Sequence, residues 1–156
     1  MSKNLIRDWM TPNPITVDLK TTLPETHKLM KYRRIRRLPV MDRGHLVGIV
    51  TLGYVREAEP SNATTLSIFE LHYLLAKLTI GEIMTREPIT ISVNAMIREA
   101  AKMMLQHKIG GLPVMDDGKL VGIITESDIF RVLAQEPDLT PENMRNEYPK
   151  FERATR

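Results

Sequence analysis

The residues best suited to binding chemistry lie at 122–128, GIITESD, where a predicted strand runs into the first turn of a helix. The ionised carboxylate of Asp128 only accepts hydrogen bonds, so it can take both hydroxyls of a ribose diol at once. The hydroxyl of Thr125 would lie beside free backbone N–H groups and the positive end of the helix dipole, a place suited to a phosphate. Thr-x-x-Asp is also an ordinary helix-start box, so these residues alone leave a ligand site and a structural cap both open.

A run of basic residues at 31–37, KYRRIRR, is the second chemical feature of the chain. It contributes five positive charges to residues 1–56, which carry 11 Lys and Arg against 4 Asp and Glu, a net +7; residues 57–156 carry 11 against 15, a net −4. This concentration predicts an anionic partner, whether a phosphate, a nucleic acid or a lipid headgroup. A solvated helix end, where cations complement the helix dipole, explains the same run without a partner.

The chain offers little that would catalyse a reaction. It contains no cysteine, which excludes thiolate catalysis, disulfides and thiolate zinc sites. No serine lies in a nucleophile-elbow context, and no glycine-rich phosphate loop follows a strand. The four histidines lack HExxH or similar spacing (His27, His45, His72 and His107). We therefore expect a binding protein with no catalytic residues and no metal site.

The composition is that of an ordinary globular protein. With 156 residues, of which 42% are apolar and 26% charged, the chain can form one domain or two small ones that share a core. No apolar run reaches the roughly 18 residues of a membrane span, and the first ten residues lack a signal-peptide core. We therefore expect a cytoplasmic protein without a membrane span.

The elements that position these residues occur twice. The segment LPVMDRGHLVGIVT at 38–51 returns as LPVMDDGKLVGIIT at 112–125, and one constant shift of 74 residues aligns residues 6–57 with 80–131. Of these 52 aligned pairs, 21 are identical. The chain is therefore predicted to be a tandem repeat.

The first copy predicts a lead-in helix, a strand, a second helix and a hairpin. Thr22 and Glu25 form a capping box at the start of the second helix, and Leu23 and Met30 mark its inner face. This helix would connect two parallel strands by a right-handed crossover. The other elements are expected at 6–10 for the lead-in, 15–17 for the first strand, and 38–41 and 46–50 for the hairpin.

The second copy predicts the same order. Asn94 is expected to cap its middle helix. A stripe with helical spacing is expected to face inward, formed by Ile97, Ala100, Ala101, Met104 and Leu105. The strands are expected at 89–91, 112–115 and 120–124, and a last helix at 126–134.

Two segments lie outside the copies. Residues 66–78 are amphipathic and are expected to pack on the core or on a second copy of the chain, with binding to a partner protein as the alternative. The residues after Gln135 show no periodicity and are predicted to be loosely attached or disordered. We therefore divide the chain into a first repeat (1–57), a linker with an amphipathic helix (58–79), a second repeat (80–135) and a polar tail (136–156).

The doubled LPVMD and LVGI(I/V)T segments resemble the CBS-domain family, and the pair resembles a Bateman module. The helical insert also resembles that of small stand-alone bacterial CBS-pair proteins of the acetoin-utilisation type. This resemblance covers about residues 4–57 and 78–135. It implies an α/β (α+β) fold of two β-α-β-β-α repeats paired about a pseudo-twofold axis. It also implies two clefts that bind adenosyl ligands, and a regulatory role without catalysis.

The ribose motif of this family, G-h-x-(S/T)-x-x-D, is matched by Gly122, Thr125 and Asp128. In the family, each cleft combines this helix start with the first strand of the other repeat and with the segment before its LPV. In the first copy Tyr54 replaces the carboxylate, so the second cleft is expected to be empty, weak or altered in ligand. The resemblance implies that the intact cleft joins Asp128, Thr125 and Ile123 to Ile15, Thr16, Ile35, Arg36 and Arg37.

The leading hypothesis is a sensor that binds AMP, ADP or ATP between its repeats, with the isoleucines around the base. The arginine pair would bind phosphate through paired hydrogen bonds, which favours a nucleotide over S-adenosylmethionine. We expect a homodimer that signals to an unidentified effector protein. A structural dimerisation module without ligand is one alternative. Nucleic-acid binding through residues 31–37 is another, but no helix-turn-helix, zinc knuckle or aromatic-rich RNA motif supports it.

Overall fold

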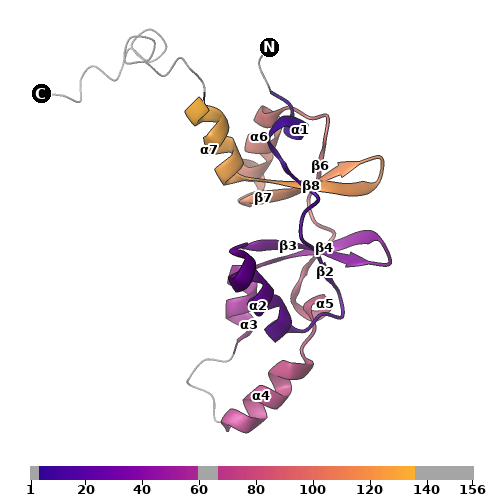
Figure 1. Ribbon diagram of the computed structural model, residues 1–156, viewed down its shortest axis with the longest axis vertical. Helices are drawn as coiled ribbons and strands as arrows, with labels where there is room; N and C mark the ends of the chain where they lie inside the picture. Colours follow the sequence, from indigo (N-terminus) through magenta and orange to yellow (C-terminus); the bar gives the residue numbers. More distant parts are fainter. Residues whose placement is uncertain (1–3, 60–66, 136–156) are drawn as a thin grey trace, which may run out of the picture.

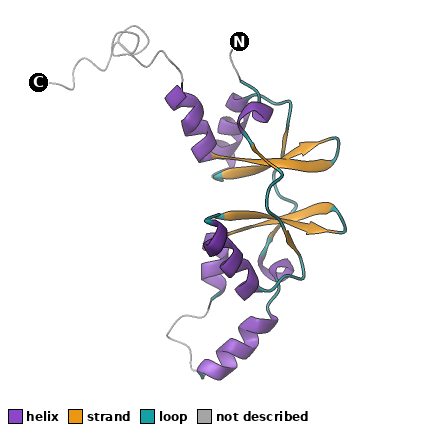
Figure 2. Ribbon diagram, in the orientation of Figure 1, coloured by secondary structure: helices purple, strands orange, loops and turns teal. Residues whose placement is uncertain are grey.

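The computed structural model describes residues 4–59 and 67–135, which fold into two units stacked one above the other (Figure 1). Each unit has a four-stranded sheet, and the two sheets face each other while the helices lie on their outer sides (Figure 2). The predicted α/β fold with two paired repeats is confirmed. The helices are α1 (Ile6–Trp9), α2 (Leu23–Arg33), α3 (Leu52–Ala58), α4 (Ile68–Lys77), α5 (Ile80–Ile83), α6 (Ile97–His107) and α7 (Glu126–Gln135). The strands are β1 (Thr11–Pro12), β2 (Val17–Asp18), β3 (Arg37–Asp42), β4 (His45–Thr51), β5 (Thr85–Arg86), β6 (Ile91–Ser92), β7 (Gly111–Asp116) and β8 (Lys119–Thr125).

The two sheets are built alike. One has the strand order β2-β3-β4-β5, and the other has the order β6-β7-β8-β1. In each repeat the first strand runs parallel to the second, and the second and third form an antiparallel hairpin. Parallel strands need a crossover connection, which α2 and α6 supply.

The first segment of each repeat packs on the other repeat. Strand β1 pairs antiparallel with β8, where Thr11 lies opposite Ile123, and β5 pairs with β4 in the same way. The short helices follow their strands. Ile6 of α1 is fully buried in the core of the second unit, and Ile80 of α5 is fully buried in the core of the first. Exchanged segments therefore join the two units, in addition to the facing sheets.

Two glycines make room for the exchanged segments. Gly48 on β4 and Gly122 on β8 occupy equivalent positions, and each lies against the methionine that leads into the exchanged strand. A Cβ atom at Gly122 would lie 2.4 Å from Sδ of Met10, and one at Gly48 would lie 2.4 Å from Sδ of Met84. Packing against Met10 therefore favours glycine at position 122 of the ribose motif, whether or not a ligand binds.

The first long helix and both hairpins follow their sequence signals. The Thr22 hydroxyl accepts a hydrogen bond from the Glu25 N–H at 3.4 Å, and the Glu25 carboxylate accepts one from the Thr22 N–H at 3.0 Å. Leu23 and Met30 are buried, as their spacing predicts. These elements formed as predicted because their signals are local, within one helical turn or one hairpin.

The cap predicted at Asn94 is wrong. Helix α6 begins after Met96, whose N–H donates a hydrogen bond to the Glu99 carboxylate at 2.7 Å. Asn94 lies earlier, in a turn where its own N–H bonds to the Ser92 hydroxyl at 3.2 Å. The helix therefore starts with a carboxylate that reaches back to the backbone, and the amide side chain has no capping role.

The predicted inward stripe of α6 is too wide. Ile97, Ala100 and Met104 are buried, and Ala101 is half-buried. Leu105 is 81% exposed, so its predicted inward position is wrong. The covered face of α6 is therefore narrower than the sequence pattern and does not extend to Leu105.

The first strand of each repeat begins later than predicted. The strands expected at 15–17 and 89–91 form at Val17–Asp18 and Ile91–Ser92. Before them, Asn13 and Glu87 have φ angles of +47° and +49°, each followed by a proline. The backbone therefore turns sharply where β1 and β5 leave the other repeat, and pairing resumes only beyond the turn.

Helix α4 carries the amphipathic pattern predicted at 66–78. Ser67 and Glu70 form a capping box at its start. Leu75 packs on the core of the first unit, whereas Phe69 is 85% exposed. None of the helices in the described ranges is long and apolar enough to cross a bilayer. The predicted polar tail lies outside the described residues.

The capping box of α2 predicts a pH dependence. Hydrogen bonds from the Thr22 backbone and hydroxyl hold the pKa of Glu25 below its ordinary value. A carboxylate with a lowered pKa in the folded state stabilises that state above its unfolded pKa, and the contribution disappears as the pH falls through the folded value. The Glu25→Gln variant should therefore melt below the wild-type protein at neutral pH. The difference should shrink when thermal unfolding is measured below about pH 4. A constant difference across this range would contradict the assignment.

Candidate ligand clefts between the two sheets

Two open cavities of similar size lie between the repeats. Cleft A, of about 660 Å³, is lined by Thr11, Asn13, Pro14, Ile15, Arg34, Ile35, Arg36, Arg37, Ile123, Thr125, Glu126 and Ser127. Cleft B, of about 650 Å³, is lined by Arg36, Arg37, Ile49, Thr51, Leu52, Gly53, Tyr54, Arg56, Thr85, Ile89, Lys108, Ile109, Gly110, Gly111 and Pro113. Most residues that line one cleft correspond, at the 74-residue shift, to residues that line the other cleft. A pseudo-twofold arrangement of the two repeats requires this correspondence.

Cleft A joins segments that are far apart in the sequence. Its wall comes from the loop between β1 and β2, from the connection of α2 to β3, and from the step from β8 into α7. Thr16 is exposed and lies outside this wall. Six of the eight predicted site residues line the one cavity, namely Ile15, Ile35, Arg36, Arg37, Ile123 and Thr125.

Asp128 lies behind the wall of cleft A, in the first turn of α7. Its side chain is only 2% exposed, and its Oδ1 atom forms an ion pair with Arg131. Its Oδ2 atom accepts hydrogen bonds from the Thr125 N–H at 2.8 Å and from the Thr125 hydroxyl at 3.1 Å. These are the bonds of a helix-start box, the structural alternative for Thr-x-x-Asp. Thr125, which does line the cavity, connects the carboxylate to cleft A.

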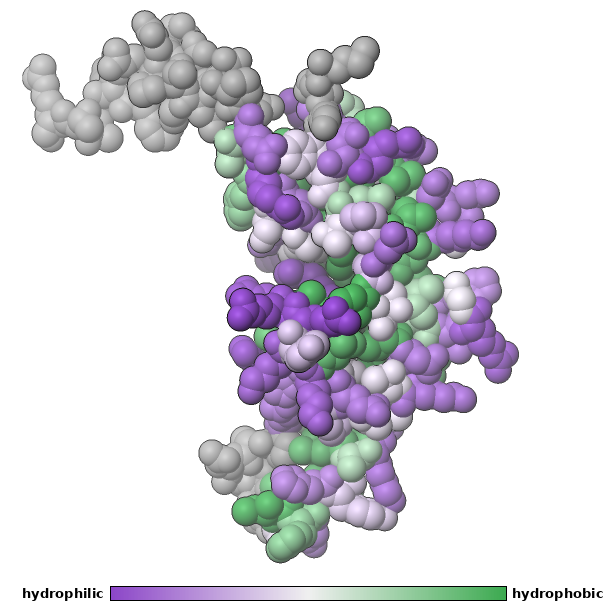
Figure 3. All heavy atoms as spheres, viewed as in Figure 1, coloured by the Kyte–Doolittle hydropathy of each residue, from purple (hydrophilic) through white to green (hydrophobic). Residues whose placement is uncertain are grey.

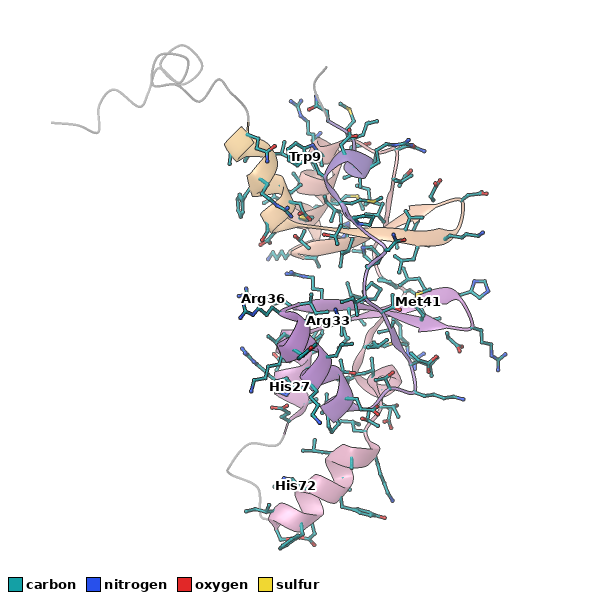
Figure 4. All side chains as sticks on the ribbon, in the orientation of Figure 1. Trp9, His27, Arg33, Arg36, Met41 and His72 are labelled. Atoms are coloured by element: carbon teal, nitrogen blue, oxygen red, sulfur yellow. The ribbon has the colours of Figure 1, made fainter. Side chains whose placement is uncertain are left out.

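Cationic side chains dominate both clefts. Cleft A has three arginines and one acid, Glu126, whereas the described lining of cleft B has three arginines, one lysine and no acid. Arg36 and Arg37 line both clefts, and their side chains form no hydrogen bond or ion pair with the residues that the structure describes. Arg36 lies beside the start of β3 (Figure 4), and strongly hydrophilic surface is seen at the middle height of the molecule (Figure 3). Unpaired cations in a concave site attract anions.

Arg37 occupies space that two glycines of the other repeat leave free. Gly110 and Gly111 stand at the positions that Arg36 and Arg37 hold in the first repeat. A Cβ atom at Gly111 would lie 2.7 Å from Cδ of Arg37, and one at Gly110 would lie 2.1 Å from its Nη2 atom. The side chain of Arg37 therefore lies along the glycine backbone, and side chains on both repeats would collide.

Cleft B differs from cleft A at the helix start. Tyr54 stands where Asp128 stands in the second repeat, and it is 45% exposed. Its N–H donates a hydrogen bond to the Thr51 hydroxyl at 3.4 Å, so the helix is still capped. A phenol donates one hydrogen bond but cannot accept from both hydroxyls of a diol as a carboxylate can. Cleft B therefore has cations like those of cleft A but no carboxylate at this helix start.

Several residues that line the clefts were not predicted from the sequence. Arg34 and Glu126 were not assigned to cleft A, nor Arg56 and Lys108 to a cleft. Glu126 directly follows Thr125 at the helix start, which is a signal that could have included it. Arg34 ends α2 in the left-handed conformation, with φ of +55°, and the sequence pattern gave no sign of this turn toward the cavity.

The two repeats match the family model of the CBS domain, over residues 6–61 and 80–135. The chain belongs to the CBS-domain family, as its doubled motif predicted. Some relatives are enzymes, and the chain spans only 22–23% of the length of two of these.

Solved structures of CBS-pair proteins share this fold. CBSX2 of Arabidopsis thaliana, solved in complex with AMP, is 29% identical with a TM-score of 0.70, over 85% of this chain and 97% of that chain. The CBS pair of protein MJ0100, solved with 5′-methylthioadenosine and S-adenosyl-L-methionine, is 32% identical with a TM-score of 0.69, over 83% and 95%. AcuB of Vibrio cholerae, named as an acetoin utilization protein, is 29% identical with a TM-score of 0.69, over 92% and 96%. The predicted likeness to CBS-pair proteins of the acetoin-utilisation type is thus confirmed.

Proposed function

We propose that the protein is a regulatory module that binds an adenine nucleotide, AMP, ADP or ATP, in cleft A. One observation carries this proposal: a single cavity combines three isoleucines, three arginines and the hydroxyl of Thr125 at a helix start. Apolar walls with a few polar groups are typical of small-molecule sites. The isoleucines would enclose the base, and the cations and the helix start would hold the phosphates.

The ligands of two similar proteins support an adenosine-containing ligand. CBSX2 binds AMP, and the CBS pair of MJ0100 binds 5′-methylthioadenosine and S-adenosyl-L-methionine. The choice between these ligands rests on charge. Arg34, Arg36 and Arg37 favour a phosphorylated ligand, because guanidinium groups pair with phosphate and would repel the sulfonium of S-adenosylmethionine.

In this proposal Asp128 accepts the ribose hydroxyls. A carboxylate offers about four acceptor positions, and Thr125 and Arg131 occupy three of them here. The Arg131 side chain is 62% exposed, so it can move into solvent when a diol arrives, provided that the ribose hydroxyls replace its bond to the buried carboxylate. Ligand binding would then exchange an ion pair within α7 for two hydrogen bonds to the sugar.

The output of the module is also a proposal. Nucleotide binding between two facing sheets would change how they sit on each other, and a cytoplasmic homodimer would pass this change to an effector protein. Nucleic-acid binding has less support, because Arg36 and Arg37 line cavities between the repeats and are not spread along one helix face.

Calorimetric titration of AMP, ADP, ATP, S-adenosylmethionine and adenosine tests the proposal. We expect one nucleotide per chain, bound more tightly than adenosine or S-adenosylmethionine. The Arg36→Gln/Arg37→Gln double variant should bind AMP about tenfold or more weakly, since a charged hydrogen bond contributes roughly 1.5–3 kcal/mol, and should bind adenosine as before. The control is Arg33→Gln, an exposed arginine that stacks on Tyr32 and lines neither cleft. The proposal would be overturned if Arg33→Gln lost as much AMP affinity as the double variant, or if the wild-type protein bound no nucleotide.

A further inference from the structure

The guanidinium group of Arg37 lies at the boundary between the two clefts. Arg37 belongs to the wall of each cleft, and the facing repeat contributes bare backbone beside its side chain, at Gly110 and Gly111. The position that a Cβ atom of Gly110 would take is 2.1 Å from Nη2 of Arg37 and 3.1 Å from Oε1 of Glu126, which lines cleft A. The group therefore touches the glycine wall of cleft B and approaches the acid of cleft A.

One guanidinium group cannot serve two phosphates in opposite clefts at full strength. Arg37 is half-buried and lies along a fixed backbone, so its reach is limited to the two cavities. Its counterpart position in the second repeat is a glycine, so the pseudo-twofold arrangement supplies no second cation at this boundary when Arg37 turns to one side. Arg36 also lines both clefts. Because its side chain is exposed, water can replace the hydrogen bonds of its guanidinium group when this group moves.

We propose that the two clefts share Arg37, so that an anion in one cleft withdraws this guanidinium from the other and weakens anion binding there. The proposal rests on nucleotide binding in cleft A. The coupling is reciprocal, because each ligand must change the affinity of the other by the same factor. It acts on charged ligands alone, so adenosine in cleft A should not respond to an anion in cleft B.

A fixed anion in cleft B tests this coupling with one ligand. Tyr54→Glu places a carboxylate in cleft B, and Tyr54→Gln is its uncharged control of the same shape. We expect AMP to bind the Tyr54→Glu protein about fivefold or more weakly than the Tyr54→Gln protein, within the usual range of coupling between sites. Adenosine should bind both proteins equally. Both pairs of titrations are run at one ionic strength, because salt screens exposed charges.

The decisive comparison repeats the pair with Arg37→Gln. If Arg37 carries the coupling, the difference between Tyr54→Glu and Tyr54→Gln should vanish in this background. A second pair of variants, at Gly53, tests whether the effect comes from the added charge or from a local distortion at position 54. Gly53 lines cleft B with its nearest atom 3.7 Å from an added Cβ, so Gly53→Asp against Gly53→Asn should repeat the result.

Three results would overturn the proposal. They are an equal AMP affinity for the charged and uncharged variants, a difference that persists with Arg37→Gln, or an equal loss of adenosine binding. The first two would leave the proposed function intact, because AMP would still bind cleft A. Absence of AMP binding in the wild-type protein would remove the proposed function, and this coupling with it.

Discussion

The Asp128→Ala variant should bind AMP about tenfold to a hundredfold more weakly than the wild-type protein, since a hydrogen bond to a charged group contributes roughly 1.5–3 kcal/mol. Adenosine should lose the same factor, because both ligands carry the ribose that this carboxylate would hold. This equal loss separates Asp128 from the arginines, whose removal should affect only the phosphorylated ligand. Calorimetric titration of both ligands at a fixed temperature measures the two factors.

The same substitution also affects folding. The carboxylate is almost fully buried and accepts two hydrogen bonds from Thr125, so its loss should cost about 1–3 kcal/mol of unfolding free energy. Affinity must therefore be measured well below the melting temperature of the variant. Tyr54→Ala is the matched control, because it changes the equivalent helix start in cleft B and should leave AMP binding unaltered. A folded Asp128→Ala protein with wild-type affinity would show that this carboxylate is only a helix cap.

The Ile6→Ala variant should lose about 2–5 kcal/mol of unfolding free energy, the usual cost of removing a fully buried aliphatic side chain. The loss should appear in the second repeat, although Ile6 belongs to the first repeat in sequence. Ile6 packs in the core formed by the second unit, and its N–H donates a hydrogen bond to the Ala95 carbonyl at 2.9 Å. Hydrogen exchange of the β7 and β8 amides locates the effect, and urea unfolding gives its size.

The neighbouring residue provides the control for this experiment. Leu5 is 36% exposed, so Leu5→Ala should change the unfolding free energy far less. The mirror variant Ile80→Ala should loosen β3 and β4, because Ile80 packs in the core of the first unit. Faster exchange in the sheet of the mutated residue's own repeat would contradict the exchange of segments.

The sequence predicted features that depend on near neighbours. The Thr22 box, the buried spacing of Leu23 and Met30, and both hairpins could be derived because each signal lies within a few residues. The likeness to CBS domains predicts more than the local signals do, because a cleft of this family combines segments of both repeats.

The remaining features depend on contacts that no local pattern encodes. The lead-in at 6–10 is too short to indicate which sheet it covers, and the helical spacing of Leu105 does not indicate that this side chain is exposed. Thr-x-x-Asp fits a cap and a ligand site equally well, and the sequence does not indicate that the Asp128 carboxylate bonds to both Thr125 and Arg131. The replacement of Arg36 and Arg37 by two glycines is visible in the sequence, but its meaning depends on the pseudo-twofold axis that brings the pairs together.

Segments α1–β1 and α5–β5 cross between the units, and this exchange restricts how a protein with two such repeats can lose or gain a repeat in evolution. Neither copy is a self-sufficient building block, because a single copy cut from this chain would expose one sheet edge and leave a hole where Ile6 or Ile80 belongs. A protein that kept only one of the two repeats would therefore have an incomplete hydrophobic core. We expect proteins of this kind to gain or lose the two repeats together.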